Sequence, residues 1–424
     1  MAPVIASILT NFANIALRSR IRDDDAIDQL NHWASSGLLL ALAIGTGAKQ
    51  YVGDPIHCWV PALYKKKHFQ KYSDSYCWIH PMYNVPMEDS IPFDEEERWF
   101  NDVGFYRWVF LMFILQAALF KFPNILWQEL KIYSGLNVSK VVGMAWETSM
   151  MKQEERDEKM GHIAHFIDRW LRTYSQYKYN ALTRFRDRFS SVIWCFGKRT
   201  GTYISGLYMF TKLLYFVNVI GQFFLLSAFL DLNFWRFGID AFTIWNKKGR
   251  WQDLYNFPRI GLCDYKVRQL ENIQTLSVQC VLSINLFLEK MYLILWFWLV
   301  MLLVFNTVNM IQWIIRGISQ TRSEAFLAKN LNLLGIDSKR QRKLFVRFTR
   351  NYLRTDGVFM LRIVADNTSE IMTLDLLKQL WKKFKESHHE DEGDLHKPNG
   401  DPVADPSAPL VEDNDDSIPP KNVD

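Results

Sequence analysis

The sequence predicts an all-α polytopic membrane protein with four transmembrane helices, and three observations support this fold class. Four stretches of 18 to 25 residues are almost free of charged side chains, and a helix needs about 20 mostly apolar residues to cross a bilayer. Lys and Arg residues are concentrated in alternate segments between these stretches. Four of the five cysteines lie as two pairs in the remaining segments.

The first predicted element, residues 1–28, is a short apolar helix followed by the charged turn "RSRIRDDDAID". Four apolar residues lie on one helical face: Ile5, Ile8, Leu9 and Phe12. The segment is too short to span a bilayer. It has no basic region ahead of its apolar stretch, so we do not expect a cleaved signal peptide.

Four spans follow, at residues 29–48, 105–127, 203–231 and 285–315. In the first, Gly37, Ala41 and Gly45 recur at every fourth residue. Such a face lets another helix approach closely, although the general abundance of small residues in membrane helices explains it equally well. In the second, Lys121 lies one turn before the inner end, where we expect its side chain to snorkel towards the headgroups.

The distribution of Lys and Arg predicts the orientation of the chain. Residues 1–28, the loop 128–202 and the segment from residue 314 together contain 33 of these cations, whereas the loops 49–104 and 232–284 contain 13. Cytoplasmic segments carry the excess of positive charge. Both termini and the central loop are therefore predicted to be cytoplasmic, and the other two loops extracellular.

The cysteines agree with this orientation. Cys58 and Cys77 lie in the first outer loop, and Cys263 and Cys280 lie in the second. Cys195 lies in the cytoplasmic loop, where reductants keep thiols reduced. The four outer cysteines therefore predict a disulfide framework, for which the residues alone leave three connectivities open.

The outer and cytoplasmic segments contain three further patterns. The acidic stretch "EDSIPFDEEERW" at 88–99 could concentrate cations at a pore mouth or form a solvated loop. A stripe in the central loop predicts a helix that packs on another cytoplasmic helix: Ile163, Phe166, Ile167, Trp170, Leu171 and Tyr174. Residues 316–386 are predicted to be helical, and the acidic, Pro-rich tail 387–424 to be disordered.

The chain has no pattern that predicts catalysis. It lacks G-x-S-x-G, a P-loop, H-E-x-x-H and C-x-x-C. His162 and His165 lie one turn apart, but no carboxylate or cysteine completes a metal site around them. The basic residues are interleaved with acids and form no nucleic-acid footprint. We therefore expect no enzyme activity, cofactor, metal or nucleic-acid partner, and membrane lipids as the surroundings.

Three segments resemble the innexins, the family of invertebrate gap-junction subunits. "CWVPALYKKKHFQKYSDSYCW" at 58–78 looks like the first extracellular loop of that family, and "CDYKVRQLENIQTLSVQCVLSINLFLEKMYLILWFW" at 263–298 is similar to the second loop with the start of the last span. "FYRWVFLMFILQAALFKFPNILW" at 105–127 resembles the signature that opens the second span. The resemblance extends from the N-terminus to about residue 385.

The resemblance implies an octameric ring around a central pore, formed by this chain alone or with other innexins. Such rings dock with the ring of a neighbouring cell at gap junctions of the plasma membrane and pass ions and small molecules passively. It also implies that the outer loops are joined by the pairs Cys58–Cys280 and Cys77–Cys263. The N-terminal helix would fold into the pore mouth, and the pore-lining residues would be Ala2, Ile5, Ile8, Leu9, Gly37, Ala41 and Gly45.

The chain departs from the family pattern at three positions. The signature reads Phe105, Tyr106, Arg107, Trp108 and Val109, with Arg107 where the family usually has glutamine. Phe110 and Ser283 stand where prolines are usual, whereas Pro123 remains near the inner end of the second span. We expect the fold to tolerate these changes, while the effect on gating is left open.

Two other functions fit the same topology. One is an undocked hemichannel like the related pannexins, which typically carry an outer-loop glycan. The two sequons here, at Asn137 and Asn367, lie on the predicted cytoplasmic side. The other is a non-conducting four-span adhesion or scaffold protein, which a conductance measurement would distinguish.

Overall fold

The computed structural model describes residues 23–60, 67–80, 82–86, 88–94, 98, 103–173, 201–336 and 341–394. The chain divides into two compact units, Met1–Trp381 and Lys382–Asp424. The membrane helices and the sheet lie in the first unit. Its described residues are mostly helical, in agreement with the predicted class, and also contain one three-stranded sheet.

Three of the described helices are long and apolar enough to cross a membrane by length and composition. They are α6 (Val109–Ile132), α10 (Tyr203–Leu230) and α12 (Ser283–Ile318). The 36 residues of α12 rise about 54 Å, which exceeds the roughly 30 Å of hydrocarbon. This helix therefore extends beyond the bilayer core.

The first predicted span is divided into three consecutive helical pieces. These are α2 (Ala26–Gln29), the π-helical segment Leu30–Ser35 and α3 (Ser36–Tyr51). Each piece is shorter than a span, but together they run without a break from Ala26 to Tyr51. That length exceeds the roughly 20 residues that a bilayer requires. The π-helical segment places Asn31 and His32 in the protein interior.

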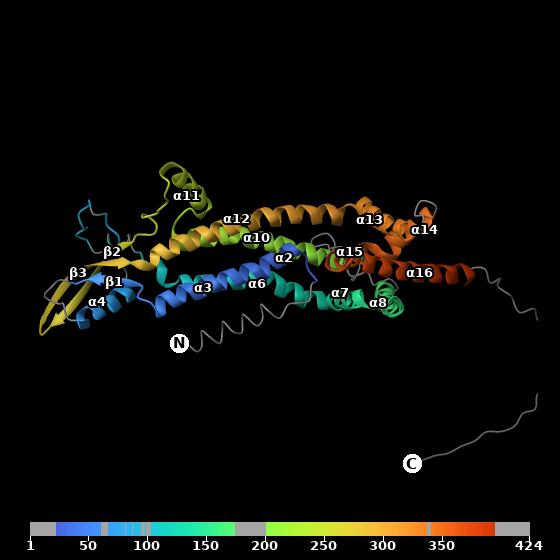
Figure 1. Cartoon of the computed structure of the whole chain (residues 1–424), viewed down its shortest axis with the longest axis horizontal. Helices are drawn as coiled ribbons and strands as arrows, with labels where there is room; N and C mark the ends of the chain where they lie inside the picture. The colour runs from blue at the N-terminus through green and yellow to red at the C-terminus, as the bar shows by residue number, and fades with distance from the viewer. Residues whose placement is uncertain are drawn as a thin grey trace, which may run out of the picture. The chain divides into compact units, whose positions relative to one another are not determined.

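The four membrane helices pack as a bundle (Figure 1), in which α3 lies against α6, and α10 lies against both α6 and α12. Aromatic rings fill the interior. The rings of Phe113 on α6 and Tyr292 on α12 have centroids 5.5 Å apart. Pro123 is accommodated inside α6, which continues as a helix to Ile132. A short helix after the third span, α11 (Phe234–Lys248), packs on α10 and α12.

An antiparallel sheet lies at one end of this bundle (Figure 1). Its order is β1 (Ile56–Trp59), β3 (Asn272–Leu282) and β2 (Ile260–Gln269). The helix α4 (Lys67–Ile79) packs on β1 and β2. The sequence pattern predicts no strands here, and the sheet is a finding of the structure. It joins the two outer loops, because β1 belongs to the first and β2 and β3 to the second.

The segments predicted to be cytoplasmic form further helices at the other end of the bundle. They are α7 (Val138–Glu147), α8 (Gln153–Thr173), α13 (Gln320–Leu333), α14 (Arg342–Arg347), α15 (Arg354–Asn367) and α16 (Glu370–Asp394). A short 3₁₀ segment, Phe105–Arg107, precedes α6, and another, Thr148–Met150, follows α7. A π-helical segment, Phe348–Leu353, connects α14 to α15. The helix α16 continues past residue 386, the boundary that composition predicts, because its acidic and basic residues tolerate a helix until "HKPNG" introduces proline and glycine.

The stripe predicted in the central loop lies on α8 and is only partly buried. Ile163, Ile167 and Leu171 are buried, as expected for a packed face. Phe166 is 46% exposed, and Tyr174 lies outside the described residues. His162 and His165 are both exposed on the opposite face.

Candidate functional site

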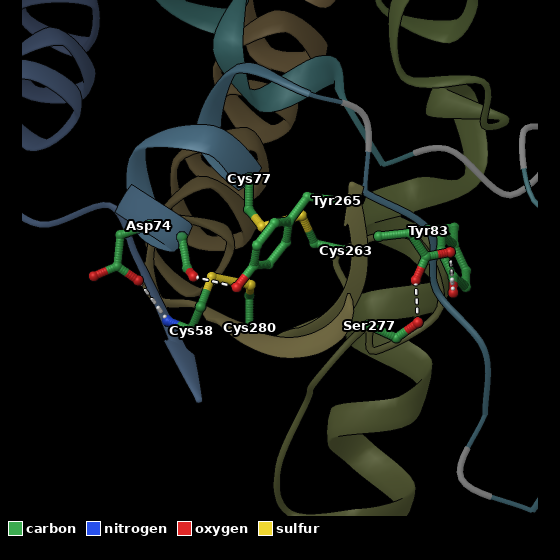
Figure 2. The surroundings of a disulfide bond; sticks show 10 residues. Cys58, Asp74, Cys77, Tyr83, Cys263, Tyr265, Ser277 and Cys280 are labelled. Carbon is green, nitrogen blue, oxygen red and sulfur yellow. Dashed lines mark hydrogen bonds between the residues drawn. A yellow bond between two sulfur atoms is a disulfide. The ribbon is translucent and has the colours of Figure 1, made fainter. Parts of the chain in front are cut away.

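The two outer loops are joined by two disulfide bonds (Figure 2). Cys58 of β1 is bonded to Cys280 of β3, and Cys77 of α4 is bonded to Cys263 of β2. Cys58 and Cys280 lie directly opposite each other in the ladder, with Cα atoms 3.9 Å apart. These are the two bonds that the family resemblance implied. All four cysteines are buried, so the bonds lie in the core of the region that the two outer loops form.

The sulfur atoms of Cys58, Cys77 and Cys280 lie within 4.8 Å of one another. Such a cluster resembles a metal site, but its sulfurs belong to the two disulfides. No thiolate is therefore left among these residues to bind a metal. Cys195 lies outside the described residues.

The helix α4 is held on the sheet by hydrogen bonds and by contacts between aromatic rings. The Ser73 hydroxyl lies 2.8 Å from the Tyr265 hydroxyl in a buried hydrogen bond, and the Tyr76 and Tyr265 rings have centroids 5.5 Å apart. At the start of the sheet, the Cys58 amide donates to Asp74 of α4 at 2.8 Å. The disulfide Cys77–Cys263 therefore reinforces a helix–sheet contact that packing and hydrogen bonds already make.

Asp264 of β2 connects the sheet to the rest of the first outer loop. Its carboxylate accepts hydrogen bonds from Tyr83 at 3.0 Å and Ser277 at 2.5 Å, and pairs with Arg98 at 2.7 Å. Burial and the neighbouring carboxylate raise the pKa of Tyr83 to about 12, so its hydroxyl remains a donor at neutral pH. Arg98 is the cation within the stretch 88–99, of which 95–97 and 99 lie outside the described residues.

The signature segment ahead of α6 connects the second span to α4. Tyr106 is fully buried, its ring centroid lies 5.1 Å from that of Trp78, and its carbonyl accepts a hydrogen bond from Gln50. Arg107, the departure from the family pattern, donates through Nη1 to the carbonyl of Ile79 at the end of α4. The substitution therefore adds a contact between the second span and the first outer loop.

The other two departures also make contacts that proline cannot. Phe110 is buried, and its ring packs edge-on against Tyr51 at a centroid distance of 5.6 Å. The Ser283 hydroxyl donates to the carbonyl of Pro55 at 3.0 Å, which ties the start of α12 to the residues preceding β1. Val109 is buried and Trp108 is 60% exposed.

The small residues predicted in the first span do not share one environment. Gly37 and Ala41 are exposed in the single subunit, and a Cβ added at Gly37 would meet no described atom within 4 Å. Gly45 is partly buried, and a Cβ there would lie 3.3 Å from Met291 of α12. The four N-terminal candidates, Ala2, Ile5, Ile8 and Leu9, lie outside the described residues.

Four aspartates at the start of the first span form a cluster that the sequence pattern does not predict; Asp23, Asp24 and Asp28 are buried, and Asp25 is partly buried. Asp23 pairs with Lys131 of α6, and its carboxylate also accepts from Ser139 of α7 at 2.9 Å. Asp25 and Asp28 both pair with Lys212 of α10, at 2.5 and 2.7 Å. The sequence signal was present in "DDDAID" and in the lysines near the inner ends of the second and third spans.

Asp24, the fourth member of this aspartate cluster, contacts the first span directly and is connected to the second span through His32. It lies 2.7 Å from Nε2 of His32, and Nδ1 of His32 lies 3.4 Å from Nζ of Lys121. Lys121 is only 5% exposed, so the expectation that it snorkels is wrong. Its ammonium is retained inside the bundle because the His32–Asp24 pair offers it a polar neighbour.

The fourth span is attached to the same cluster. Asn309 and Trp313 of α12 donate to Asp25 at 3.0 and 2.9 Å, and Asn31 and Asn306 exchange two hydrogen bonds in the interior. The aspartate cluster therefore joins all four membrane helices at the end where the first span begins.

The helices predicted to be cytoplasmic contact the membrane bundle through a helix cap. Asp356 of α15 accepts hydrogen bonds from the amides of Ser205 and Ile204 at 3.0 and 3.3 Å, in the first turn of α10. A carboxylate at a helix N-terminus satisfies unpaired amides and favours the helix dipole. Burial raises the pKa of Asp356, although these hydrogen bonds oppose the shift. This contact links the third span directly to the cytoplasmic region.

Comparison with known proteins agrees with these features. A family model described as Innexin matches residues 24–384. Among curated proteins, Innexin unc-9 of Caenorhabditis elegans is 35% identical over 378 residues, covering 88% of this chain and 95% of that protein. Innexin-11 of the same organism is 33% identical over 374 residues, covering 85% of this chain and 79% of that protein. Innexin-3 is 32% identical over 364 residues.

Proposed function

Since the chain belongs to the innexin family, it is a multi-pass gap-junction channel subunit of the plasma membrane, and we propose that its channel is an octameric ring. Membership of this channel family implies that the chain assembles as an oligomer and that it is not an enzyme. In the ring, each subunit contributes the bundle of four membrane helices, with both termini in the cytoplasm. The copies are either all of this chain or include other innexins.

The pore of this ring is lined by the exposed face of α3 and by the N-terminal segment. The exposure of Gly37 and Ala41 in the single subunit supports this, because small residues leave room for a wide passage. Gly45 borders the same surface on the α12 side. Ala2, Ile5, Ile8 and Leu9 precede Asp23, whose pairing with Lys131 anchors the base of the N-terminal segment. From that anchored base the segment reaches the pore mouth.

The disulfide-bonded sheet is the part of the subunit that docks with a ring of the neighbouring cell. The observation that carries this proposal is the joining of both outer loops into one sheet by Cys58–Cys280 and Cys77–Cys263. Two covalent bonds limit the conformations of the loops, which lowers the entropic cost of docking. The sequence has no glycosylation sequon in 49–104 or 232–284 that would obstruct a close approach.

Junctional current between two paired cells, each expressing only this chain, tests the proposal. Current across the pair, with none in uncoupled single cells, supports a docking channel formed by this chain alone. Current in single cells without junctional current indicates an undocked hemichannel. Absence of both, with the protein detected at the cell surface, indicates a required partner subunit or a non-conducting adhesion role.

A further inference from the structure

The helix α11 has an apolar face that the described residues cover only in part. Phe234, Phe237 and Ala241 are buried against the bundle. On the adjoining flank and in the last turns, Ile239, Phe242 and Trp245 are 55%, 69% and 62% exposed. The charged residues Arg236, Asp240 and Lys247 lie on the remaining side, at helical spacings of four and seven. An amphipathic helix with exposed aromatic residues requires a partner surface.

The contacts of α11 with α10 place it beside the outer end of the third span. The Phe234 amide donates to the Ser227 hydroxyl at 3.1 Å, and the Trp235 ring stacks on Phe223 at a centroid distance of 4.2 Å. Both partners lie within the last two turns of α10, which ends at Leu230. The helix therefore folds back alongside the span instead of continuing away from it.

The contact with α12 shows how far α11 lies along the apolar run of the fourth span. Gly238 lies against the ring of Trp296, whose Nε1 donates to the carbonyl of Trp235 at 3.3 Å. Trp296 lies five residues inside the uncharged run that begins at Met291. At 1.5 Å per residue this is about 7 Å along the helix. Interfacial helices bury their apolar face to a similar depth at the boundary between headgroups and acyl chains.

The side of the bundle that carries α11 faces away from the first span. Figure 1 shows α11 beside α10 and α12, on the opposite side from α3. Phe224 of α10 is 62% exposed, and its ring lies 5.8 Å from that of Trp235. The exposed apolar surface of the third span is thus continuous with α11. If α3 faces the pore, as the proposed function states, this continuous surface faces the surrounding lipid.

We propose that α11 is an interfacial helix that inserts Ile239, Phe242 and Trp245 into the outer leaflet of the phospholipid bilayer. Lys247 and Lys248, exposed in its last turn, reach the headgroup phosphates with their ammonium groups. Trp245 occupies the interfacial level at which tryptophan is enriched in membrane proteins. The helix thereby anchors the second outer loop to the membrane beside the docking sheet. The choice of lipid over water or a neighbouring subunit rests on the proposed function.

Spin labels on the assembled channel test this placement. In a Cys195→Ser background the four remaining cysteines are disulfide-bonded, so a new cysteine can be labelled alone. Phe242→Cys and Asp240→Cys are labelled with a nitroxide in full-length protein reconstituted in phosphatidylcholine nanodiscs. Their accessibilities to oxygen, which partitions into lipid, and to a water-soluble nickel chelate are measured. Ile239→Cys serves as a second reporter if Phe242→Cys does not assemble.

The expected result is that the Phe242 label collides several-fold more often with oxygen than with the nickel chelate, and that the Asp240 label shows the reverse. Nickel access at both positions would overturn the proposal, because the apolar flank would then face water. Protection of Phe242 from both reagents would also overturn it and would identify a neighbouring subunit as the cover. Junctional current measured on the same variants separates this result from the proposed channel function, since either can hold without the other.

Discussion

Cys58 of β1 and Cys280 of β3 lie directly opposite each other in the sheet and are covalently bonded, although 222 residues separate them in the chain. We expect Cys58→Ser and Cys280→Ser each to abolish junctional current between paired cells, because the first outer loop then loses one of its two covalent ties to the second, the one that fixes β1 on the sheet. Loss of a native disulfide typically costs about 2–5 kcal/mol in small extracellular domains. Cys77→Ser and Cys263→Ser should have the same effect.

Cys195→Ser is the matched control for these variants, because its cysteine belongs to the segment predicted to be cytoplasmic. It should retain coupling. Surface biotinylation of each variant separates a docking defect from a failure to reach the membrane. Normal coupling in all four outer-loop variants would refute the role of the disulfides.

Lys212 forms ion pairs with both Asp25 and Asp28 in the aspartate cluster. Lys212→Met leaves Asp25 and Asp28 without their ion-pair partner, and an uncompensated buried charge costs about 3–5 kcal/mol. We expect a marked fall in the melting temperature of the purified oligomer, or loss of the oligomer on a sizing column. Adding Asp25→Asn and Asp28→Asn to Lys212→Met should restore part of the stability.

Lys329→Met provides the comparison for Lys212→Met. Lys329 forms an ion pair with Glu370 at 3.3 Å, but both side chains are more than half exposed. Surface pairs contribute about 0–1 kcal/mol, so this variant should melt close to the wild-type temperature. Equal melting temperatures for the two lysine variants would show that the aspartate cluster is not a stabilising element.

Arg107 supplies a contact that the usual family residue does not. Arg107→Gln should remove the hydrogen bond to the carbonyl of Ile79, at a cost of about 1 kcal/mol for a partly exposed bond. We expect coupling to persist with a slightly lower melting temperature. Arg268→Gln, at an exposed position on β2, should leave melting unchanged. A loss of coupling in Arg107→Gln without a change in stability would assign Arg107 a role in gating.

Gly238 allows α11 to approach α12 closely. A Cβ at this position would overlap the ring of Trp296, a buried side chain held by its hydrogen bond to Trp235. Gly238→Ala should therefore destabilise the protein by about 1–3 kcal/mol through overpacking. Gly221→Ala on α10 meets no described atom within 4 Å, so its higher helix propensity should leave stability equal or improved. Similar melting curves for the two variants would contradict the close packing of α11.

Much of the architecture could be predicted because it depends on local composition. The helices α6, α10 and α12 lie within a few residues of the predicted spans, since long apolar runs with few charged residues are typical of membrane spans. The sheet was missed even though β2 and β3 contain alternating apolar residues. β2 and β3 pair with each other as neighbours in the chain, whereas β1 pairs with β3 across more than 200 residues, a contact that no local pattern reveals.

The sequence by itself determined the number of spans, their orientation and the separation of the cysteines into outer and inner groups, because hydropathy and charge act on each segment independently of its partners. Only the tertiary structure decided which aspartate meets which lysine, why Lys121 is buried, and where α11 lies against Trp296. These contacts join residues from different helices, and their energies depend on burial and distance. Neither quantity exists until the bundle has packed.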